Sequence, residues 1–188
     1  MRARIVASIA DGGPASISAM ARGATRALDE LVRAGVRHTV HEYAIHDPGG
    51  AAPRPGQRPA WGEEAAAALG VDPARIHKTL IASVDGRLAV AVVAVSAELD
   101  LKALAEVLGG RKAVMAEPAE AERATGYVRG GISPLGQRRR LPTVVDATAL
   151  GLERILVSAG RRGLQVELAP ADLVRATGAV VAPIARFP

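Results

Sequence analysis

Hydrophobic residues recur at helical spacing in several separate segments of the chain. Leu28, Leu31 and Val32 would share one side of a helix that Gly35 ends, because glycine readily adopts the conformation that closes a helix. Asp100 has the character of a helix N-cap. The predicted helices span residues 24–36, 61–71, 100–110, 117–125 and 170–178.

Other segments alternate between apolar and polar residues, as strands do. Residues 78–84 and 87–95 flank Asp85 and Gly86, the dipeptide type that favours a two-residue hairpin turn. Hairpins mixed with single helices predict a mixed α/β domain and argue against a regularly wound parallel sheet. Shorter strands are predicted over residues 37–45, 112–116, 141–146, 154–160, 164–168 and 179–184.

The length of 188 residues suits one domain. Residues 1–20 lack a sustained period and are predicted to form a flexible extension, with the domain over residues 21–188. Met20 stands just before the first helix, so we hypothesise that it is the true start of the native protein. The prolines and glycines of residues 46–60 predict a long loop. The chain has no apolar run long enough to span a bilayer.

Composition narrows the function classes. The only aromatic residues are Tyr43, Trp61, Tyr127 and Phe187, so the core must be aliphatic and each aromatic is either packing or part of a site. Cysteine is absent, which excludes disulfides and thiolate metal sites and makes a cytoplasmic location the expectation. The net charge of +5 suits a polyanionic partner such as RNA.

Several common catalytic motifs are missing. Ser133 lies in "GISPLG", which is not the strand–elbow–helix pattern of a nucleophilic serine. The chain lacks phosphate-binding glycine motifs of the Walker and dinucleotide types. The spacing of His38 and His41 matches no closed metal site. We therefore expect neither a metal nor a cofactor.

Lys78 is the residue that fits its surroundings least. It would share a strand face with Ile76, Leu80 and Val84, although lysine is seldom buried without a partner. The lysine could reach water from a strand end, or it could be the cation of a site. His77 points to the opposite strand face, so we do not assign it as a general base.

A glycine-rich loop and two arginine clusters are further candidates. Gly130 and Gly131 would let a ligand approach the backbone. Ser133 and Pro134 predict a short helical turn whose amides bind anions or carbonyl oxygens, although an ordinary turn is the alternative. Two arginine clusters, at residues 138–140 and 161–162, suit phosphate contacts or form a solvated face.

These segments together resemble a known family. "KTL" after a short helix, "LDLKALAEVLG", "ATGYVRGGISPLGQRRRLPTVVD" and "ILVSAGRRGLQVEL" are similar to the YbaK-type aminoacyl-tRNA deacylases, which are related to the editing domain of bacterial prolyl-tRNA synthetase. The resemblance runs from about Ala24 to Ile184. It implies one compact domain with a barrel-like mixed sheet flanked by helices, and hydrolysis of the ester between a wrong amino acid and tRNA.

The resemblance also implies roles for particular residues. The family's essential lysine falls on Lys78, and Gly131 would contribute backbone near the substrate carbonyl. The sequence departs from the family at Ala159, where glycine is usual, and at Gln165, where some members carry an acidic residue. The implied substrate-binding residues are Tyr43, Trp61, Thr79, Gly130, Ile132, Ser133, Ser158, Gly160 and Gln165.

The expected function is that of a Cys-tRNA(Pro) deacylase acting on the acceptor end of mischarged tRNA, beside prolyl-tRNA synthetase and away from membranes, as a monomer or a weak dimer. Lys78 would either polarise the carbonyl or anchor the tRNA end, and water or the substrate thiol would attack. Two alternatives stay open. One is a deacylase of Ala-, Ser- or Thr-tRNA, and the other is a non-catalytic adaptor that binds tRNA or a synthetase.

Overall fold

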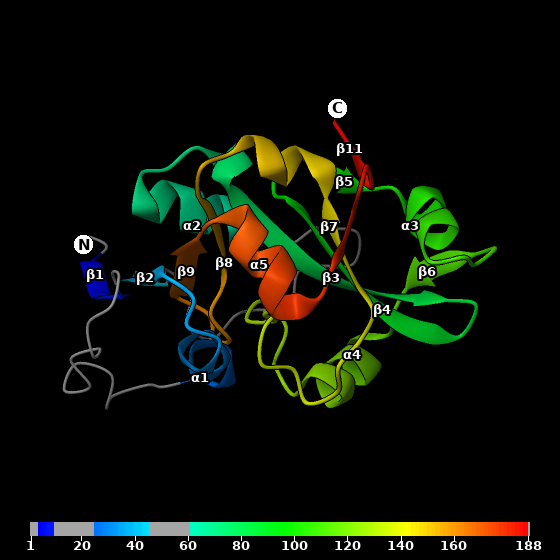
Figure 1. The fold of residues 1–188 in the computed structure, drawn as a ribbon, viewed down its shortest axis with the longest axis horizontal. Helices are drawn as coiled ribbons and strands as arrows, with labels where there is room; N and C mark the ends of the chain where they lie inside the picture. Colours follow the sequence, from blue (N-terminus) through cyan, green and yellow to red (C-terminus); the bar gives the residue numbers. More distant parts are fainter. Residues whose placement is uncertain (1–3, 10–24, 46–60, 188) are drawn as a thin grey trace.

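The computed structural model describes residues 4–9, 25–45 and 61–187 (Figure 1). The predicted loop over residues 46–60 and Met20 lie outside the described residues. The strands are β1 (Arg4–Ile9), β2 (His38–Glu42), β3 (Ile76–Val84), β4 (Arg87–Ala94), β5 (Glu98–Leu99), β6 (Ala113–Met115), β7 (Thr143–Asp146), β8 (Ile155–Ser158), β9 (Leu164–Leu168), β10 (Val180–Ala182) and β11 (Ala185–Arg186). The helices are α1 (Arg26–Arg33), α2 (Trp61–Leu69), α3 (Leu101–Val107), α4 (Pro118–Thr125) and α5 (Pro170–Thr177).

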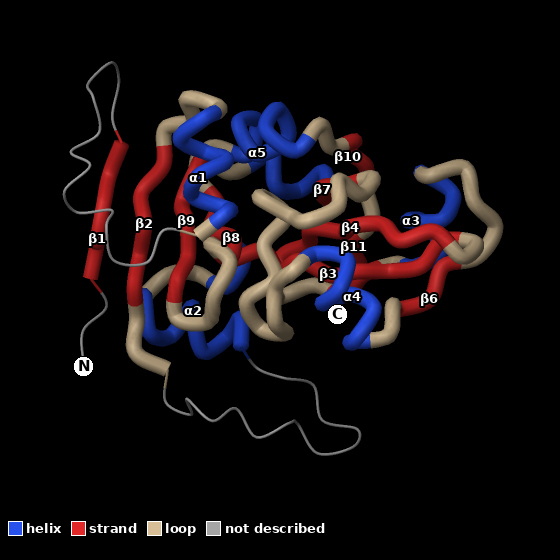
Figure 2. The backbone as a smooth tube through the Cα atoms, turned by 90° about the horizontal axis from the view of Figure 1, so that it is seen from below, coloured by secondary structure: helices blue, strands red, loops and turns tan. Residues whose placement is uncertain are grey.

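Most of the strands form one mixed sheet. Its order in the described chain is β1–β2–β9–β8–β3–β4–β7–β10, with β6 paired to a second part of β3. The strands β1, β2, β9 and β8 run side by side in Figure 2, and the β3–β4 hairpin extends away from them. The mixed sheet and the helices predicted from the sequence are confirmed. Within the described residues, the path of paired strands ends at β1 and at β10.

Helices cover both faces of the sheet. The larger part of the core joins residues of α1, α4 and α5 to one face, which includes Ile81, Val92 and Val157. On the opposite face, α3 packs on Ala91 and Val93, and α2 packs separately around Ile76 and Leu156. β4 is buried over nearly its whole length because both of its faces are covered. None of the described helices is long and apolar enough to cross a membrane.

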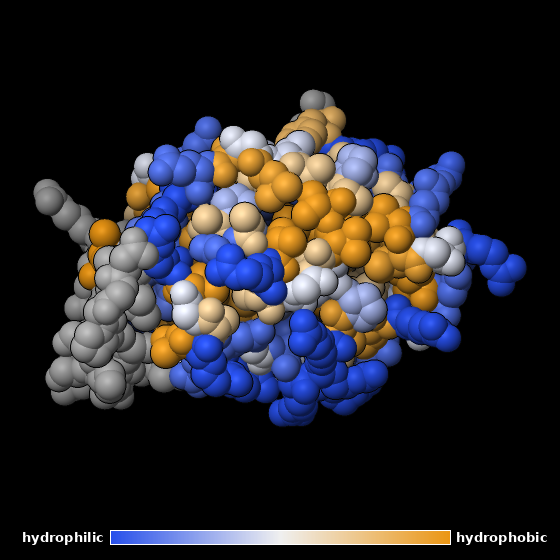
Figure 3. Space-filling model, viewed as in Figure 1, coloured by the Kyte–Doolittle hydropathy of each residue, from blue (hydrophilic) through white to orange (hydrophobic). Residues whose placement is uncertain are grey.

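The surface seen in Figure 3 has hydrophobic residues across its middle and hydrophilic residues along its lower rim. The exposed large hydrophobic residues are scattered over several elements and include Val114, Leu150, Val180 and Phe187. Such scattered residues are normal on a protein surface.

The N-terminal segment differs from the prediction. Residues 4–9, which we expected within a flexible extension, form β1 and pair antiparallel with β2. A six-residue segment without hydrophobic periodicity can still be ordered when it completes the hydrogen bonds of an exposed sheet edge. Single-sequence patterns do not reveal this kind of pairing, since it depends on the partner strand. β5 and β11, which pair with each other, were also not predicted.

The edge of β3 determines where the site lies. On one side β4 pairs with β3 from His77 to Val84. On the other side β8 pairs only with Ile76 and His77, and β6 pairs only from Ala82 to Val84. The described chain therefore leaves the middle of β3 without a neighbouring strand on this edge. The gap between β8 and β6 opens at Lys78 and Thr79.

Candidate active site

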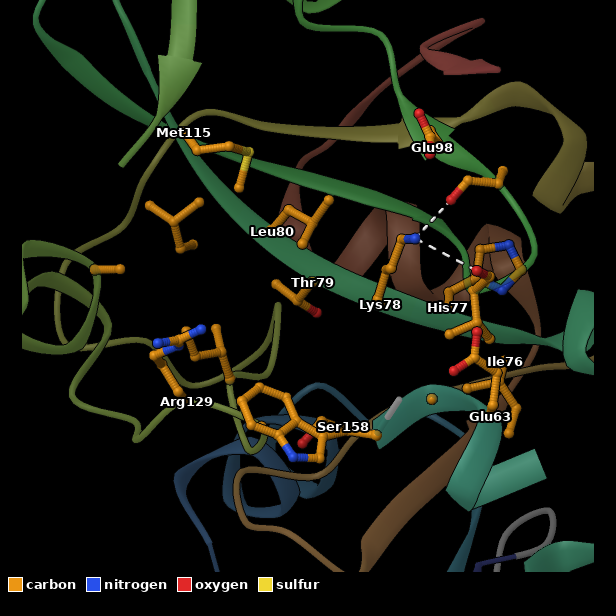
Figure 4. Close-up of a pocket in the computed structure, with 18 of the residues that line it drawn as sticks. Glu63, Ile76, His77, Lys78, Thr79, Leu80, Glu98, Met115, Arg129 and Ser158 are labelled. Atoms are coloured by element: carbon orange, nitrogen blue, oxygen red, sulfur yellow. Dashed lines mark hydrogen bonds between the residues drawn. The ribbon is translucent and has the colours of Figure 1, made fainter. Parts of the chain in front are cut away.

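A cavity of about 820 Å³ lies at this gap (Figure 4). It is lined by Tyr43 just after β2 and by residues from α2, β3, the β4–β5 connection, β5, β6, α4, the glycine-rich loop, β8 and β9. Eight of the site residues predicted from the sequence line it, namely Tyr43, Trp61, Lys78, Thr79, Gly130, Ile132, Ser158 and Gln165. The other three, Gly131, Ser133 and Gly160, are not among its lining residues.

The Lys78 ammonium is fixed by the backbone that follows β4. Its Nζ donates to the carbonyl of Ala97 at 2.5 Å and points toward the carbonyl of Val95 at 3.4 Å. Lys78 is half-buried, and its ammonium stands within the cavity wall (Figure 4). A cation held by carbonyl dipoles in a partly apolar wall is less screened than one in water. The structure thus places a localised positive charge in the cavity.

Thr79 presents its backbone groups to the gap. The carbonyl of Ile76 accepts from Val95 on the β4 side, whereas the carbonyl of Ile81 accepts from Ala116 on the β6 side. Backbone groups of successive strand residues point to alternate edges. The N–H and C=O of Thr79 therefore point into the gap, where the described chain has no pairing strand. Its Oγ1 is buried and has no hydrogen-bond partner within the described chain.

Gln165 and Tyr43 form the part of the lining contributed by the β9 and β2 side. Burial raises the pKa of the Tyr43 hydroxyl, an effect that a hydrogen bond with the Gln165 side chain opposes. Gln165 Oε1 is buried and has no partner among the described residues. Buried polar atoms are normally satisfied. The unpaired oxygens of Gln165 and Thr79 in one cavity therefore indicate a polar ligand or ordered water.

His77 is a lining residue that the strand pattern had set aside. Strand alternation does turn it away from Lys78, but the gap in the β3 edge lets residues of both faces reach the cavity. Its Nδ1 lies 3.3 Å from the Arg75 carbonyl, and its Nε2 is buried without a partner in the described chain. The sequence could have indicated the gap, because β6 and β8 are too short to pair with the whole of the nine-residue β3.

The two buried histidines predict an acid-sensitive fold. Burial lowers the pKa of His38 and of His77 below the ordinary 6.5. Below about pH 6.5 these histidines bind protons in the unfolded chain but stay neutral in the folded chain. As the pH falls, the free energy of unfolding therefore decreases by up to about 1.4 kcal/mol per pH unit for each histidine. Urea unfolding between pH 7.5 and 5.5 should show this loss, and His77→Gln should reduce its slope. A free energy of unfolding that is constant over this range would contradict the prediction.

The glycine-rich loop is held in place by its own turn. The amide of Gly131, expected to face the substrate carbonyl, donates to the Val128 carbonyl at 3.0 Å. A Cβ on Gly131 would lie 2.9 Å from Cα of Arg161, so this glycine allows the loop to touch the turn before β9. The helical turn predicted at Ser133 and Pro134 is wrong, because only bends occur there. Ser133 is fully buried, and its Oγ accepts from the Leu135 amide.

Gly160 supports the site without lining it. Its φ of +97° is unfavourable for other residues, and a Cβ there would lie 2.8 Å from Tyr127 Cε1. Its amide points to Ser158 Oγ at 3.3 Å. Gly160 therefore shapes the turn between β8 and β9, while Ser158 itself reaches the cavity.

The arginine clusters separate in the structure. Arg138, Arg139 and Arg140 are exposed and do not line the cavity. Arg161 pairs with Glu42 at 2.8 Å, whereas the guanidinium of Arg162 lies over the Trp61 ring at 4.9 Å from its centroid. Arg129, which the sequence analysis did not single out, lines the cavity. Across the described residues, no group of three or more histidine, aspartate or glutamate side chains could hold a metal ion.

Comparison with known proteins gives a consistent result. The model of the aminoacyl-tRNA editing domain matches residues 59–176, which include Lys78, the glycine-rich loop and Gln165. The Enterococcus faecalis protein named "Putative Cys-tRNA(Pro)/Cys-tRNA(Cys) deacylase EbsC" is 41% identical over 124 residues, which are 65% of this chain and 75% of that protein. An Escherichia coli K12 protein named "Multifunctional Ser/Thr-tRNA deacylase ProXp-y" is 33% identical over 52% of this chain and 62% of its own length.

Solved structures agree with these relatives. The structure titled "Crystal structure of a putative trans-editing enzyme for prolyl tRNA synthetase" superposes with a TM-score of 0.70 at 26% identity, over 86% of this chain and 95% of that one. A second, of the hypothetical protein APE2540, gives a TM-score of 0.73 at 27% identity, over 86% of this chain and 100% of that one. The resemblance and the fold class predicted from the sequence are confirmed: this chain belongs to the aminoacyl-tRNA editing domain family.

Proposed function

We propose that this protein is a trans-editing hydrolase that cleaves the ester bond of mischarged tRNA, with Cys-tRNA(Pro) as its main substrate. The observation that carries the proposal is the Lys78 ammonium, fixed on backbone carbonyls in the wall of the cavity at the β3 gap. Membership of the editing-domain family and 41% identity to a protein named as a Cys-tRNA deacylase support the same reaction.

The geometry suggests how the chain would assist ester hydrolysis. The ester carbonyl oxygen would lie between Lys78 Nζ and the Thr79 amide, which points into the gap. When a nucleophile attacks the carbonyl carbon, these donors stabilise the developing oxyanion. The carbon–oxygen bond to the terminal adenosine then breaks, and its 3′ oxygen takes the proton that the attacking water or thiol gives up. Gly131, whose amide is occupied by Val128, would act by shaping the loop.

The identity of the nucleophile depends on the substrate. Water serves for any aminoacyl ester. The thiol of a cysteinyl ester can instead attack its own carbonyl and displace the 3′ oxygen, which gives a cyclic thioester that water then opens to free cysteine. Because the ester is already reactive, positioning and oxyanion stabilisation are sufficient for catalysis. A strong general base is therefore unnecessary, in agreement with the enclosed position of His77 Nε2.

The size of the cavity supports an acceptor-end substrate. Its volume of about 820 Å³ lies in the range of small-molecule sites, enough for an aminoacyl group and part of the terminal adenosine. The rest of the tRNA would lie outside it. We propose that the protein works in the cytoplasm beside prolyl-tRNA synthetase, as a monomer or weak dimer, because a small domain has little surface for reading a whole tRNA.

Seryl- or threonyl-tRNA is a second candidate substrate. Thr79 and Gln165 line the cavity, and neither Thr79 Oγ1 nor Gln165 Oε1 has a hydrogen-bond partner among the described residues. Such an oxygen accepts a hydrogen bond from a hydroxyl as readily as from a thiol. The Escherichia coli relative is named as a Ser/Thr-tRNA deacylase.

A panel of charged tRNAs distinguishes the substrates. We expect the highest kcat/KM for Cys-tRNA(Pro). Ser- and Thr-tRNA should be lower, because their hydroxyls are weaker nucleophiles than a thiol. Ala-tRNA should be lower by about tenfold or more, since a methyl side chain leaves the buried polar atoms of the lining without a partner, at a cost of about 1–3 kcal/mol. Gln165→Leu should reduce this preference, with Gln137→Leu as the control outside the cavity. A higher kcat/KM for Ser-tRNA would reassign the substrate, and no turnover of any member would leave only the adaptor alternative.

A further inference from the structure

Trp61 lies between two arginines at the cavity. The guanidinium of Arg162 is 4.9 Å from the centroid of its ring, and that of Arg129 is 5.7 Å away. Both distances are within the range of cation–π attraction. Trp61 and Arg129 line the cavity, and Figure 4 shows Arg129 on the side away from Lys78 and His77. Arg129 therefore lies apart from the reacting centre, and Arg162 meets it at the same ring.

The two arginines are presented by turns of the same construction. In the glycine-rich loop the Gly131 amide bonds to the Val128 carbonyl, so Arg129 is the second residue of a four-residue turn and Gly130 is the third. Before β9, the Leu164 amide bonds to the Arg161 carbonyl, which gives Arg162 and Gly163 the same two places. Gly130 and Gly163 both have positive φ, +80° and +76°, as the third residue of such a turn requires.

The two turns are packed against each other and against the ring. A Cβ on Gly130 would lie 3.0 Å from Arg162 Nε and 3.1 Å from Trp61 Cδ2. The Arg129 amide is further held by Glu122 Oε1 at 2.9 Å. Both turns are therefore ordered before a ligand binds, which reduces the loss of conformational entropy on binding.

The charges of these arginines are not neutralised within the described chain. Arg161 and Arg75 pair with Glu42 and Glu167, respectively. By contrast, no described carboxylate forms an ion pair with Arg129 or Arg162. When the flat face of a guanidinium stacks on an aromatic ring, the N–H donors in the plane of the guanidinium remain able to bind an anion. Phosphate is the anion that this donor arrangement suits best.

We propose that Arg129 and Arg162 form a phosphate clamp for the single-stranded 3′ end of tRNA, with Trp61 as the scaffold that holds both guanidiniums. The clamp would contact the phosphates of the terminal nucleotides while the ester enters the cavity toward Lys78. Trp61 then supports the two cations, and it is not a platform on which the terminal adenine stacks. This inference rests on the proposed function, since it names the part of the substrate held at the same site.

Salt dependence of RNA binding tests the clamp. The variants are Arg129→Gln, Arg162→Gln and their combination, with Arg87→Gln at the distant hairpin end as the charge-matched control. The affinity of each variant for a fluorescent acceptor-stem RNA that carries no amino acid is measured by anisotropy at several salt concentrations. Each single variant should weaken binding about tenfold and make the slope of log Kd against log salt shallower by about 0.7, the value for one single-strand phosphate contact. The wild-type slope in the double variant would overturn the clamp.

Two further experiments distinguish phosphate binding by the clamp from stacking of a base on Trp61. An RNA that lacks its two terminal nucleotides should give wild-type protein the slope of the double variant, which tests the clamp without altering the fold. Trp61→Leu should weaken binding in the wild-type background and have no further effect in the double variant. An equal effect of Trp61→Leu in both backgrounds would show stacking and contradict the scaffold role.

These experiments distinguish failure of the phosphate clamp from failure of the proposed hydrolase function. Altered slopes without any deacylation would support the clamp and refute the hydrolase. Deacylation by the wild type with unaltered slopes in the arginine variants would support the hydrolase and refute the clamp. At saturating Cys-tRNA(Pro), kcat of the double variant should stay within about threefold of wild type, because phosphate contacts bind the ground state and the transition state alike and the loss falls on KM.

Discussion

Replacing Lys78 with alanine is expected to lower kcat for deacylation by at least about 10²-fold, the usual cost of one oxyanion donor. The ammonium is held by the carbonyls of Ala97 and Val95, so its charge is fixed where the ester carbonyl would lie. Alanine removes this charge without adding bulk. Single-turnover hydrolysis of Cys-tRNA(Pro), with enzyme in excess, measures the chemical step directly.

The control for this variant is Lys102→Ala. Lys102 has the same charge but lies on the exposed side of α3, with its side chain 85% exposed. It should retain the wild-type rate. Lys78→Arg adds a second comparison, since it keeps the charge and changes the geometry. If Lys78→Ala loses only affinity for RNA and keeps its single-turnover rate, Lys78 anchors the tRNA end and does not polarise the carbonyl.

Replacing Gly136 with alanine should destabilise the fold by about 3 kcal/mol or more. Its φ is +62°, which costs a non-glycine residue about 1–2 kcal/mol. In addition, its Cβ would lie 2.3 Å from the backbone carbon of Arg26 in α1. Because backbone cannot rotate away as a side chain can, this overlap adds roughly 1–3 kcal/mol. Chemical denaturation gives the difference in free energy of unfolding.

Gly35→Ala separates the two contributions. Gly35 also has φ +62°, but a Cβ there meets nothing within 4 Å. Its substitution should cost only the conformational part. Gly136 anchors the end of the glycine-rich loop on α1, where its amide also donates to Glu30, so the unfolding of Gly136→Ala should begin with loss of the site. Equal destabilisation by the two variants would show that the close approach to α1 contributes nothing.

Local chemistry made much of the fold predictable. Asp85 and Gly86 form the predicted hairpin turn with positive φ at both residues. Asp100 caps α3 through bonds to the amides of Lys102 and Ala103. Lys78 stood out because a lysine interrupts an aliphatic strand face, and this local inconsistency marked the site before any fold was known.

What the sequence did not predict depends on contacts between distant segments. β1 is ordered by its pairing with β2. His77 reaches the cavity only because β6 and β8 leave part of β3 uncovered. The clamp requires Trp61, Arg129 and Arg162 to meet from three separate parts of the chain. The family resemblance supplied the roles of the loop glycines, but not the hydrogen bond that occupies the Gly131 amide.

The most direct test of the proposed function is hydrolysis of Cys-tRNA(Pro) by the wild-type protein, compared with Pro-tRNA(Pro) and with buffer alone. We expect rapid loss of cysteine from tRNA(Pro), while Pro-tRNA(Pro) decays at its spontaneous rate. Decay of Cys-tRNA(Pro) at the buffer rate, by protein shown to be folded and to bind the RNA, would contradict the assignment of this chain as a Cys-tRNA(Pro) deacylase.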